Sequence, residues 1–265
     1  MTTATAGAAK IDDVLAYWNR RPCNLRHSAK EVGTKEYFDE VEQRKYFVEP
    51  HIHGFAQFER WKGKRVLEVG CGLGTDAVNF ARAGADYHAV ELSEVSMNLA
   101  KKRFDVFGLS GNFVLTKGEE LAQFFPVQSF DLVYSFGVIH HTPEPVEIVR
   151  QMRKVIKADG ELRLMVYAKN SWKDAMIEAG FDQPEAQTGC PVAYTYTLEE
   201  ARQLLEGFEI TSLEQDHIFP YVVEKYVKYE YEPQPWFGAM PEDMFRALEK
   251  RFGWHMLIKA KPLPK

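Results

Sequence analysis

The feature that most restricts the fold is the alternation of short apolar runs with helical stretches after Arg65. This alternation is typical of a parallel sheet that is covered by helices on both faces. Ligands of such sheets bind at the carboxyl ends of the strands, where the strand order reverses. We expect helices to begin near Thr75, Val95 and Pro145, and we expect strands at residues 65–69, 87–91, 112–115, 130–135 and 160–168.

Two further segments flank this alternation. Residues 11–60 show mostly helical spacing of apolar and aromatic residues. Residues 169–265 contain an expected helix at 198–207, strands at 208–215 and 254–261, and an aromatic stretch between those strands. No internal repeat or Gly/Ser-rich linker divides the chain. We therefore predict one domain over 1–265, made of a helical segment (11–60), a core (61–168) and a late insertion with the final strands (169–265).

Composition excludes several classes of protein. The chain has 265 residues, a net charge of −5 and 45% hydrophobic residues, so a globular fold is expected and nucleic acid is not the expected partner. No apolar run approaches the ~20 residues that a bilayer span requires. The N-terminus lacks a secretory pattern, and the three cysteines form neither a CxxC pair nor a disulfide scaffold. We expect a cytoplasmic protein without a membrane partner.

The most informative residues are VLEVGCGLGT, positions 66–75. An apolar strand runs into Gly70, Gly72 and Gly74 and then directly into a helix, so backbone can approach a ligand closely. A dinucleotide fingerprint would place its third glycine where Thr75 stands, and a P-loop would require a lysine. Both NAD and ATP are therefore disfavoured.

Glu68 precedes this loop at the end of a strand that should be buried. A buried carboxylate is costly unless it meets a cation or hydrogen-bond donors. It would repel a pyrophosphate but would suit a cationic amino group. The alternative is an ion pair with Arg65 or Arg82.

The sequence E-V-G-C-G-L-G resembles motif I of the class I S-adenosylmethionine-dependent methyltransferases, and the resemblance extends over about residues 60–168. Residues 130–141, FDLVYSFGVIHH, resemble motif IV of the small-molecule branch that includes ubiquinone and menaquinone methyltransferases. The resemblance implies an α/β, Rossmann-like, seven-stranded, mostly parallel sheet with helices on both faces. It also implies S-adenosylmethionine as cofactor, a helical N-terminal lid and a late insertion that caps the substrate.

The resemblance also assigns roles to residues. It implies that the glycine turn supports the methionine part of the cofactor, that Glu91 holds the ribose hydroxyls, and that Gly118 and Glu119 lie at the adenine edge. Taken alone, Glu91 could equally be an acid that caps the helix after Ser93. The expected cofactor-binding residues are Glu68, Gly70, Gly72, Gly74, Thr75, Asp76, Glu91, Leu92, Gly118, Glu119, Ser135, Phe136 and His140.

His140 and His141 are the candidate catalytic residues. A sulfonium methyl is already activated, so alignment of the reactants supplies most of the catalysis and no metal is expected. Histidine titrates near neutrality and can deprotonate a hydroxyl, phenol or amine. Alternatively, the pair belongs to a polar loop, or the acceptor is a carboxylate, thiolate or carbanion that needs no base.

Acceptor binding is the least determined part. The turn at residues 19–28, NRRPCNLRHS, could clamp a carboxylate or phosphate, or it could be a solvated charged run beside core aromatics. The late tyrosines could contact an acceptor or fill the core. The candidate acceptor-binding residues are Tyr17, Arg21, Arg26, His27, Tyr194 and Tyr221.

The leading hypothesis is methyl transfer from S-adenosylmethionine to an oxygen, nitrogen or carbon of a small acidic or aromatic acceptor. A non-catalytic S-adenosylmethionine-binding module is the alternative. A nicotinamide oxidoreductase is disfavoured by the glycine spacing and by Glu68. Methylation of nucleic-acid bases is disfavoured by the acidic charge and by the lack of an Asn/Asp-Pro-Pro-Tyr/Phe sequence at residues 135–138. The acceptor and the oligomeric state stay open.

Overall fold

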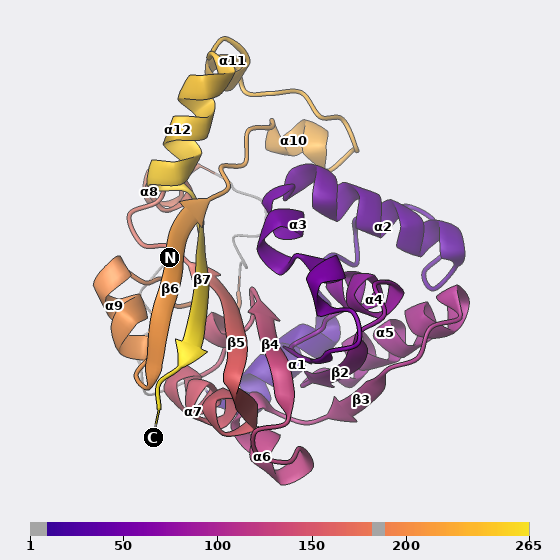
Figure 1. Cartoon of the computed structure of the whole chain (residues 1–265). Coiled ribbons are helices and arrows are strands. Elements are labelled where there is room, and N and C mark those ends of the chain that lie inside the picture. Colours follow the sequence, from indigo (N-terminus) through magenta and orange to yellow (C-terminus); the bar gives the residue numbers. More distant parts are fainter. Residues whose placement is uncertain (1–9, 182–188, 265) are drawn as a thin grey trace.

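A computed structural model describes residues 10–181 and 189–264 and shows seven strands in one sheet (Figure 1). The strand order is β3-β2-β1-β4-β5-β7-β6, and only β7 runs antiparallel to its neighbours. The predicted fold class is thereby confirmed. The strands are β1 (Arg65–Val69), β2 (Asp86–Glu91), β3 (Asn112–Leu115), β4 (Phe130–Phe136), β5 (Ile156–Tyr167), β6 (Phe208–Asp216) and β7 (His255–Pro262).

The strand order reverses at β1, which pairs with β2 on one side and with β4 on the other. The connections after β1 and after β4 therefore leave the sheet in opposite directions. This divergence opens a crevice at the carboxyl ends of β1 and β4, which is where ligands of open α/β sheets bind.

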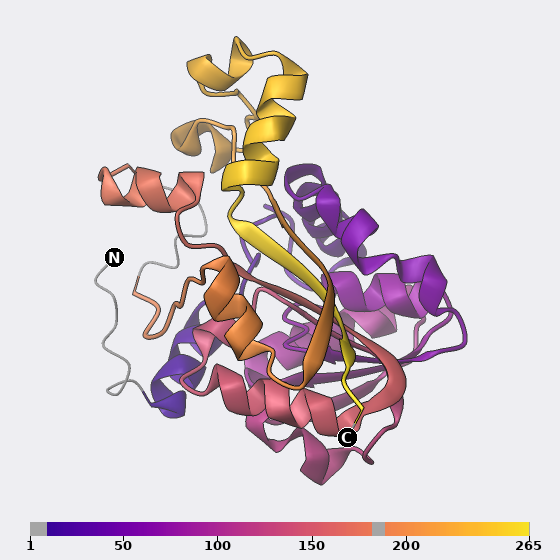
Figure 2. The ribbon, with the colours of Figure 1, turned by 60° about the vertical axis from the view of Figure 1, so that its left-hand side comes forward.

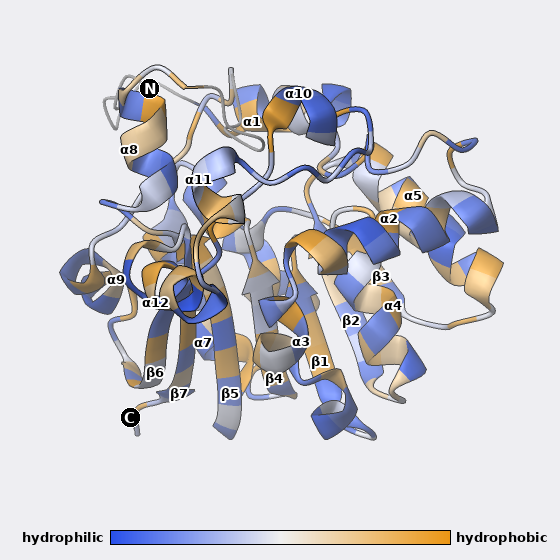
Figure 3. Cartoon of the chain, turned by 90° about the horizontal axis from the view of Figure 1, so that it is seen from above, coloured by the Kyte–Doolittle hydropathy of each residue, from blue (hydrophilic) through white to orange (hydrophobic). Residues whose placement is uncertain are grey.

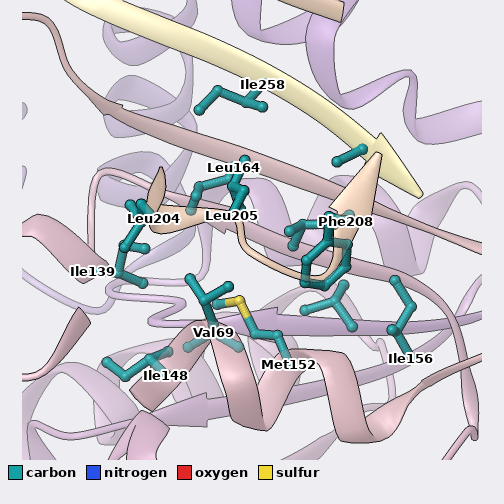
Figure 4. Close-up of a cluster of buried hydrophobic side chains, with 14 of the residues drawn as sticks. Val69, Ile139, Ile148, Met152, Ile156, Leu164, Leu204, Leu205, Phe208 and Ile258 are labelled. Atoms are coloured by element: carbon teal, nitrogen blue, oxygen red, sulfur yellow. The ribbon is translucent and has the colours of Figure 1, made fainter. Parts of the chain in front are cut away.

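Helices cover both faces because the strand side chains alternate between them. Leu162 and Leu164 of β5 join a core with α7 (Pro145–Val155) and α9 (Leu198–Leu204), shown in Figure 4. Met165 and Tyr167 of the same strand join the opposite core. That core is built with α4 (Thr75–Arg82), α5 (Glu94–Phe107) and α3 (His51–Ala56). Figure 3 shows hydrophilic and hydrophobic residues mixed along covering helices such as α4 and α5.

The N-terminal segment forms several helices. The first is α1 (Ile11–Arg20). The long helical pattern before Arg60 is divided into α2 (Lys35–Val48), α3 and a 3₁₀ turn at Phe58–Trp61. Pro50 stands at the first break, where its ring removes a backbone donor and restricts the preceding residue. The chain therefore turns there, which brings the end of α2 and the start of α3 over the sheet.

The late segment lies mainly beyond one end of the sheet, between β6 and β7 (Figures 1 and 2). It contains α10 (Val223–Tyr226), α11 (Pro235–Gly238) and α12 (Glu242–Phe252), while α8 (Trp172–Glu178) follows β5 and a short α6 (Leu121–Phe124) precedes β4. The segment contacts the N-terminal part of the chain, because Arg44 of α2 donates to the Tyr226 carbonyl at 2.6 Å. Within residues 10–181 and 189–264, no helix has the length and apolar character needed to cross a bilayer.

Candidate functional site

A cavity of about 150 Å³ lies at the carboxyl ends of β1, β2 and β4. The glycine loop forms part of its wall, and helix α1 contributes Ile11, Val14 and Trp18. The cavity therefore occupies the crevice that the strand order creates. It is where the sequence predicts the ligand.

The glycines of the loop have two different roles. Gly70 has φ +80°, and a Cβ there would lie 2.5 Å from the Val138 side chain, which also lines the cavity. Gly74 does not line the cavity. It caps α4 with φ +73°, and a Cβ there would press on Ala100 of α5 at 3.2 Å. Gly74 therefore allows two helices to approach each other, whereas Gly70 and Gly72 present backbone to the cavity.

Glu91 ends β2 with both carboxylate oxygens bonded to backbone. One oxygen accepts from the Gly72 N–H and the other from the Ser93 N–H, both at 2.9 Å. These bonds fix the carboxylate at the cavity wall between the glycine loop and the start of α5. Burial raises the pKa of Glu91, and the backbone donors oppose that rise.

Glu68 lines the same cavity from β1 and is almost fully buried. Its carboxyl accepts a 2.5 Å hydrogen bond from the Tyr87 hydroxyl. Burial, reinforced by the charge of Asp76, raises the pKa of Glu68 to about 8. The alternative ion pairs are not formed, because Arg65 pairs with Asp86 and Arg82 pairs with Glu42.

Asp76 is held by three side chains at the start of α4. It forms a 2.8 Å ion pair with Lys45 and accepts hydrogen bonds from Tyr134 at 2.8 Å and Tyr46 at 3.0 Å. Lys45, from α2, also lines the cavity, and the sequence analysis did not single it out. Nothing in the local sequence marks it, because α2 reaches the sheet only through the tertiary fold.

The opposite end of the cavity is formed by residues that follow β3. Thr116, Lys117, Gly118 and Glu119 line it. The Glu119 Oε2 atom is buried without a hydrogen-bond partner among the described residues. Burial raises the pKa of this carboxyl. The site therefore offers an unused acceptor or, when protonated, an unused donor.

The two adjacent histidines differ in their surroundings. His141 lines the cavity, and its Nδ1 lies 2.9 Å from the Val192 carbonyl. That contact requires Nδ1 to carry the proton, so Nε2 holds a lone pair. Nε2 is buried and has no hydrogen-bond partner among the described residues. Burial lowers the pKa of His141 to about 4, which keeps the ring neutral.

His140 and Ser135 lie outside the cavity lining, contrary to the sequence prediction. His140 is fully buried against Tyr167, with a ring separation of 3.8 Å. Ser135 donates to the Val69 carbonyl at 2.9 Å and so joins β4 to β1. The two histidines belong to a 3₁₀ turn at Ile139–His141, in which successive side chains point about 120° apart, so only one of the two reaches the cavity.

Most of the predicted cofactor-binding residues are brought together by the fold. The cavity is lined by Glu68, Gly70, Gly72, Thr75, Asp76, Glu91, Leu92, Gly118, Glu119 and Phe136. Gly74, Ser135 and His140 are the exceptions. Residues that the sequence analysis did not place there include Trp18, Cys23, Asn24, Lys45, Ser96, Thr116 and Ile148.

The candidate acceptor-binding residues do not line this cavity. In the turn at 19–28 its lining is provided by Cys23 and Asn24, while Arg21 and Arg26 are exposed. The other four lie elsewhere. Tyr17 packs against Trp18, and His27 is half-buried near Arg44 and Lys45. The Tyr194 N–H donates to the His140 carbonyl, and Tyr221 stacks on Phe47.

Residues 67–162 match a family model described as a methyltransferase domain. Ubiquinone biosynthesis O-methyltransferase of Salmonella paratyphi A is 28% identical over 158 residues, which cover 59% of this chain and 64% of that protein. The protein of the same name from Neisseria meningitidis serogroup A is 34% identical over 110 residues, covering 41% of this chain and 46% of that one. The chain thus spans slightly less than two thirds of the first of these relatives.

A solved structure extends the similarity to nearly the whole fold. Magnesium protoporphyrin IX methyltransferase from Synechocystis, solved with bound SAH, superposes with a TM-score of 0.63 at 17% identity. The superposition covers 96% of this chain and 100% of that one. At this identity the similarity concerns the fold.

Proposed function

We propose that this chain, which belongs to the class I S-adenosylmethionine-dependent methyltransferases, transfers the cofactor's methyl group to a hydroxyl oxygen of a small aromatic acceptor. The observation that carries the choice of an oxygen is that His141, a residue of the cavity wall, has an Nε2 atom with no hydrogen-bond partner among the described residues. Oxygen is also the methylated atom in the names of the curated relatives.

The cavity residues fit the cofactor. We assign the ribose hydroxyls to Glu91, whose carboxylate is already fixed by the Gly72 and Ser93 N–H groups. Glu119 is suited to the adenine edge because its Oε2 lacks a partner. The methionine amino group fits near Glu68, whose carboxyl can ionise beside a cation, and the methionine carboxylate fits near the Lys45 ammonium. When bound, S-adenosylmethionine supplies an electrophilic methyl group on a sulfonium.

His141 is suited to accept the proton of a hydroxyl as the oxygen attacks. The Val192 carbonyl holds the ring in the tautomer that leaves Nε2 unprotonated. Because burial lowers its pKa to about 4, the lone pair is present throughout the neutral range. The ring is a weak base, so its main contributions are to orient the hydroxyl and to receive the proton late in the transfer.

The walls near His141 favour a planar acceptor. Trp18 lies edge-on to the His141 ring with a centroid separation of 5.3 Å, and Phe136 also lines the cavity. Aromatic rings bind planar molecules through such edge and face contacts. These contacts favour a phenol over an aliphatic alcohol.

The test combines turnover with cofactor binding. The protein is incubated with S-adenosylmethionine and a panel of phenols and catechols, and formation of S-adenosylhomocysteine is measured. We expect His141→Gln to lower kcat by about 10²–10⁴-fold, as for loss of a general base. Its affinity for S-adenosylhomocysteine, measured by calorimetry, should match that of the unchanged protein.

His88→Gln is the matched control, because His88 lies on β2 beside Asp86 and does not line the cavity. It should retain both turnover and binding. Equal turnover in His141→Gln would remove the role proposed for His141. Tight cofactor binding without turnover on any acceptor would instead favour the non-catalytic module.

A further inference from the structure

A second group of chemistry-bearing side chains lies outside the cofactor cavity. Glu49, His217 and His255 are all buried, and each directs one ligand atom to a point where the three atoms lie within 4.8 Å of one another. We call these three residues the histidine–glutamate cluster. None of them lines the cofactor cavity. They come from three separate places in the sequence: the end of α2, the residue after β6 and the first residue of β7.

Two further residues, His51 and Asp216, lie next to this cluster and position the His255 ring. His51 Nε2 lies 3.0 Å from His255 Nδ1, and His51 Nδ1 lies 4.0 Å from the Asp216 carboxylate. If His255 donates its Nδ1 proton to His51 Nε2, the His255 Nε2 atom carries a lone pair. That Nε2 atom lies 3.6 Å from the Glu49 carboxylate. Two acceptors at this distance require a cation or a proton between them. Support of a histidine through its second nitrogen is also the usual arrangement around protein-bound metals.

The backbone around His217 is strained in the way that functional positions often are. His217 has φ +74°, a left-handed conformation that side chains with a Cβ rarely adopt. The strand partner holds it there, because the Trp254 N–H donates to the His217 carbonyl at 2.8 Å. Gly253 permits the close approach, since a Cβ at that residue would lie 2.2 Å from the Asp216 carbonyl oxygen. The fold therefore maintains the position of the His217 ring at a cost in backbone strain.

A second cavity adjoins the two residues that support the cluster. This cavity, of about 310 Å³, lies between α3 and the β6–β7 edge of the sheet, and both His51 and Asp216 line it. The Phe136 ring separates the cluster from the cofactor cavity, with its centroid 5.4 Å from the His255 ring. The cluster itself is buried, and the second cavity adjoins it through His51 and Asp216.

We propose that Glu49, His217 and His255 bind a divalent first-row transition-metal ion, with Zn²⁺ and Fe²⁺ as the best-matched ions. Two imidazoles and one carboxylate suit these ions, whereas Mg²⁺ and Ca²⁺ prefer sets of oxygen ligands. Metal–ligand bonds of about 2.0–2.2 Å place ligand atoms about 3–4 Å apart, so small side-chain movements are enough to close the site. Lys45 and Lys173 also face the cluster, and the Glu49 and Asp216 charges offset them.

The bound ion would join three parts of the chain that are far apart in the sequence. Glu49 is the C-terminal capping residue of α2, His217 follows β6, and His255 is the first residue of β7, so the two histidines flank the part of the late segment that carries α10, α11 and α12. One ion bound to all three would fix the N-terminal helices and the late segment against the sheet. Ion binding to the folded state alone also stabilises that state. This role is independent of the methyl transfer proposed above.

The experiment uses the full chain without a polyhistidine tag, stripped with dipicolinate and titrated with Co²⁺. We expect a visible ligand-field absorption band that saturates and that Zn²⁺ displaces. Glu49→Gln, which keeps the side-chain shape, should weaken Co²⁺ binding by at least about 100-fold, and His51→Gln by about 10–100-fold. His88→Gln, which changes a histidine beside another carboxylate, should bind Co²⁺ like the unchanged protein.

The absence of a Co²⁺ band in the unchanged protein would overturn the proposal. Equal Co²⁺ affinities of Glu49→Gln and the unchanged protein would overturn it as well. Binding of S-adenosylhomocysteine verifies that each variant is folded, because Glu49 and His51 do not line the cofactor cavity. Weak S-adenosylhomocysteine binding by the unchanged protein would count against the proposed function and leave the metal result standing.

Discussion

Glu68 is a buried glutamate that lines the candidate cofactor cavity and carries a proton at neutral pH. It is a carboxyl that lines a ligand cavity while burial and the charge of Asp76 raise its pKa to about 8. The free protein therefore holds a proton on Glu68 at pH 7, where an ordinary glutamate would be ionised. A cationic amino group bound beside it would favour the ionised form and lower that pKa.

We expect binding of S-adenosylhomocysteine at pH 7 to release up to about one proton from Glu68. Calorimetry in buffers with different ionisation enthalpies measures the number released. Glu68→Gln, which can still accept the Tyr87 hydrogen bond, should abolish the release. Equal proton release by Glu68→Gln and the unchanged protein would show that the amino group lies elsewhere.

At the scale of elements, one buried arginine joins three helices. Arg103 of α5 donates to the Thr75 hydroxyl of α4 at 2.8 Å. It also donates to the Phe38 carbonyl and to the Glu42 carboxylate of α2, both at 3.0 Å. The Arg103 side chain is fully buried, so loss of the guanidinium would remove all three hydrogen bonds, although the Glu42 carboxylate would keep its pairing with Arg82.

We expect Arg103→Met to lower the free energy of unfolding by about 3–5 kcal/mol, since it breaks a buried ion pair. Arg82→Met is the matched control, because Arg82 pairs with the same Glu42 carboxylate at 2.7 Å but is 35% exposed. Arg82→Met should lower the free energy of unfolding by only about 0–1 kcal/mol. Urea denaturation measures both, and equal costs would mean that burial of the pair does not decide its contribution.

At the scale of the whole molecule, the notable feature is the number of buried neutral histidines. Burial lowers the pKa of His27 to about 3 and the pKa values of His51 and His141 to about 4. It lowers those of His140, His217 and His255 further below the usual 6.5. Between pH 6.5 and about 4 the unfolded chain therefore binds protons at these positions that the folded chain does not.

Stability should accordingly fall as the pH is lowered from about 6.5 to about 4. Each of these histidines lowers the free energy of unfolding by up to about 1.4 kcal/mol for each pH unit of acidification in that window. Glu68, Glu91, Glu119 and Glu249 act in the opposite direction, since their raised pKa values make the folded state bind extra protons, but these four carboxyls are outnumbered by the six histidines.

Urea denaturation of the chelator-treated protein between pH 7.5 and 4.5 measures this slope. His140→Leu removes a ring whose two nitrogens lack partners among the described residues. It should reduce the slope of the unfolding free energy against pH by the amount that corresponds to about one bound proton. A free energy of unfolding that stays constant over the whole range would contradict the predicted protonation states.

Much of the sheet, and most of the residues that line the candidate cofactor cavity, could be predicted from the sequence. The strands at 65–69 and 112–115 and the helix starts at Thr75 and Pro145 coincide with the structure. Helix α12 was not predicted, and the helical pattern before Arg60 was not divided at Pro50. The limits of the N-terminal segment, core and late segment stay a prediction.

Features that depend on neighbours along the chain can be read from the sequence: the strand–turn–helix around Gly70, the sheet that it belongs to, and the two acids at the ends of β1 and β2. Long-range packing in the folded chain sets the rest. It brought Lys45 to the cavity, turned His141 toward it and His140 away, and gathered Glu49, His217 and His255. The physical reason is that local periodicity fixes the direction of a side chain within its own element, whereas its neighbours across the fold depend on how whole elements pack.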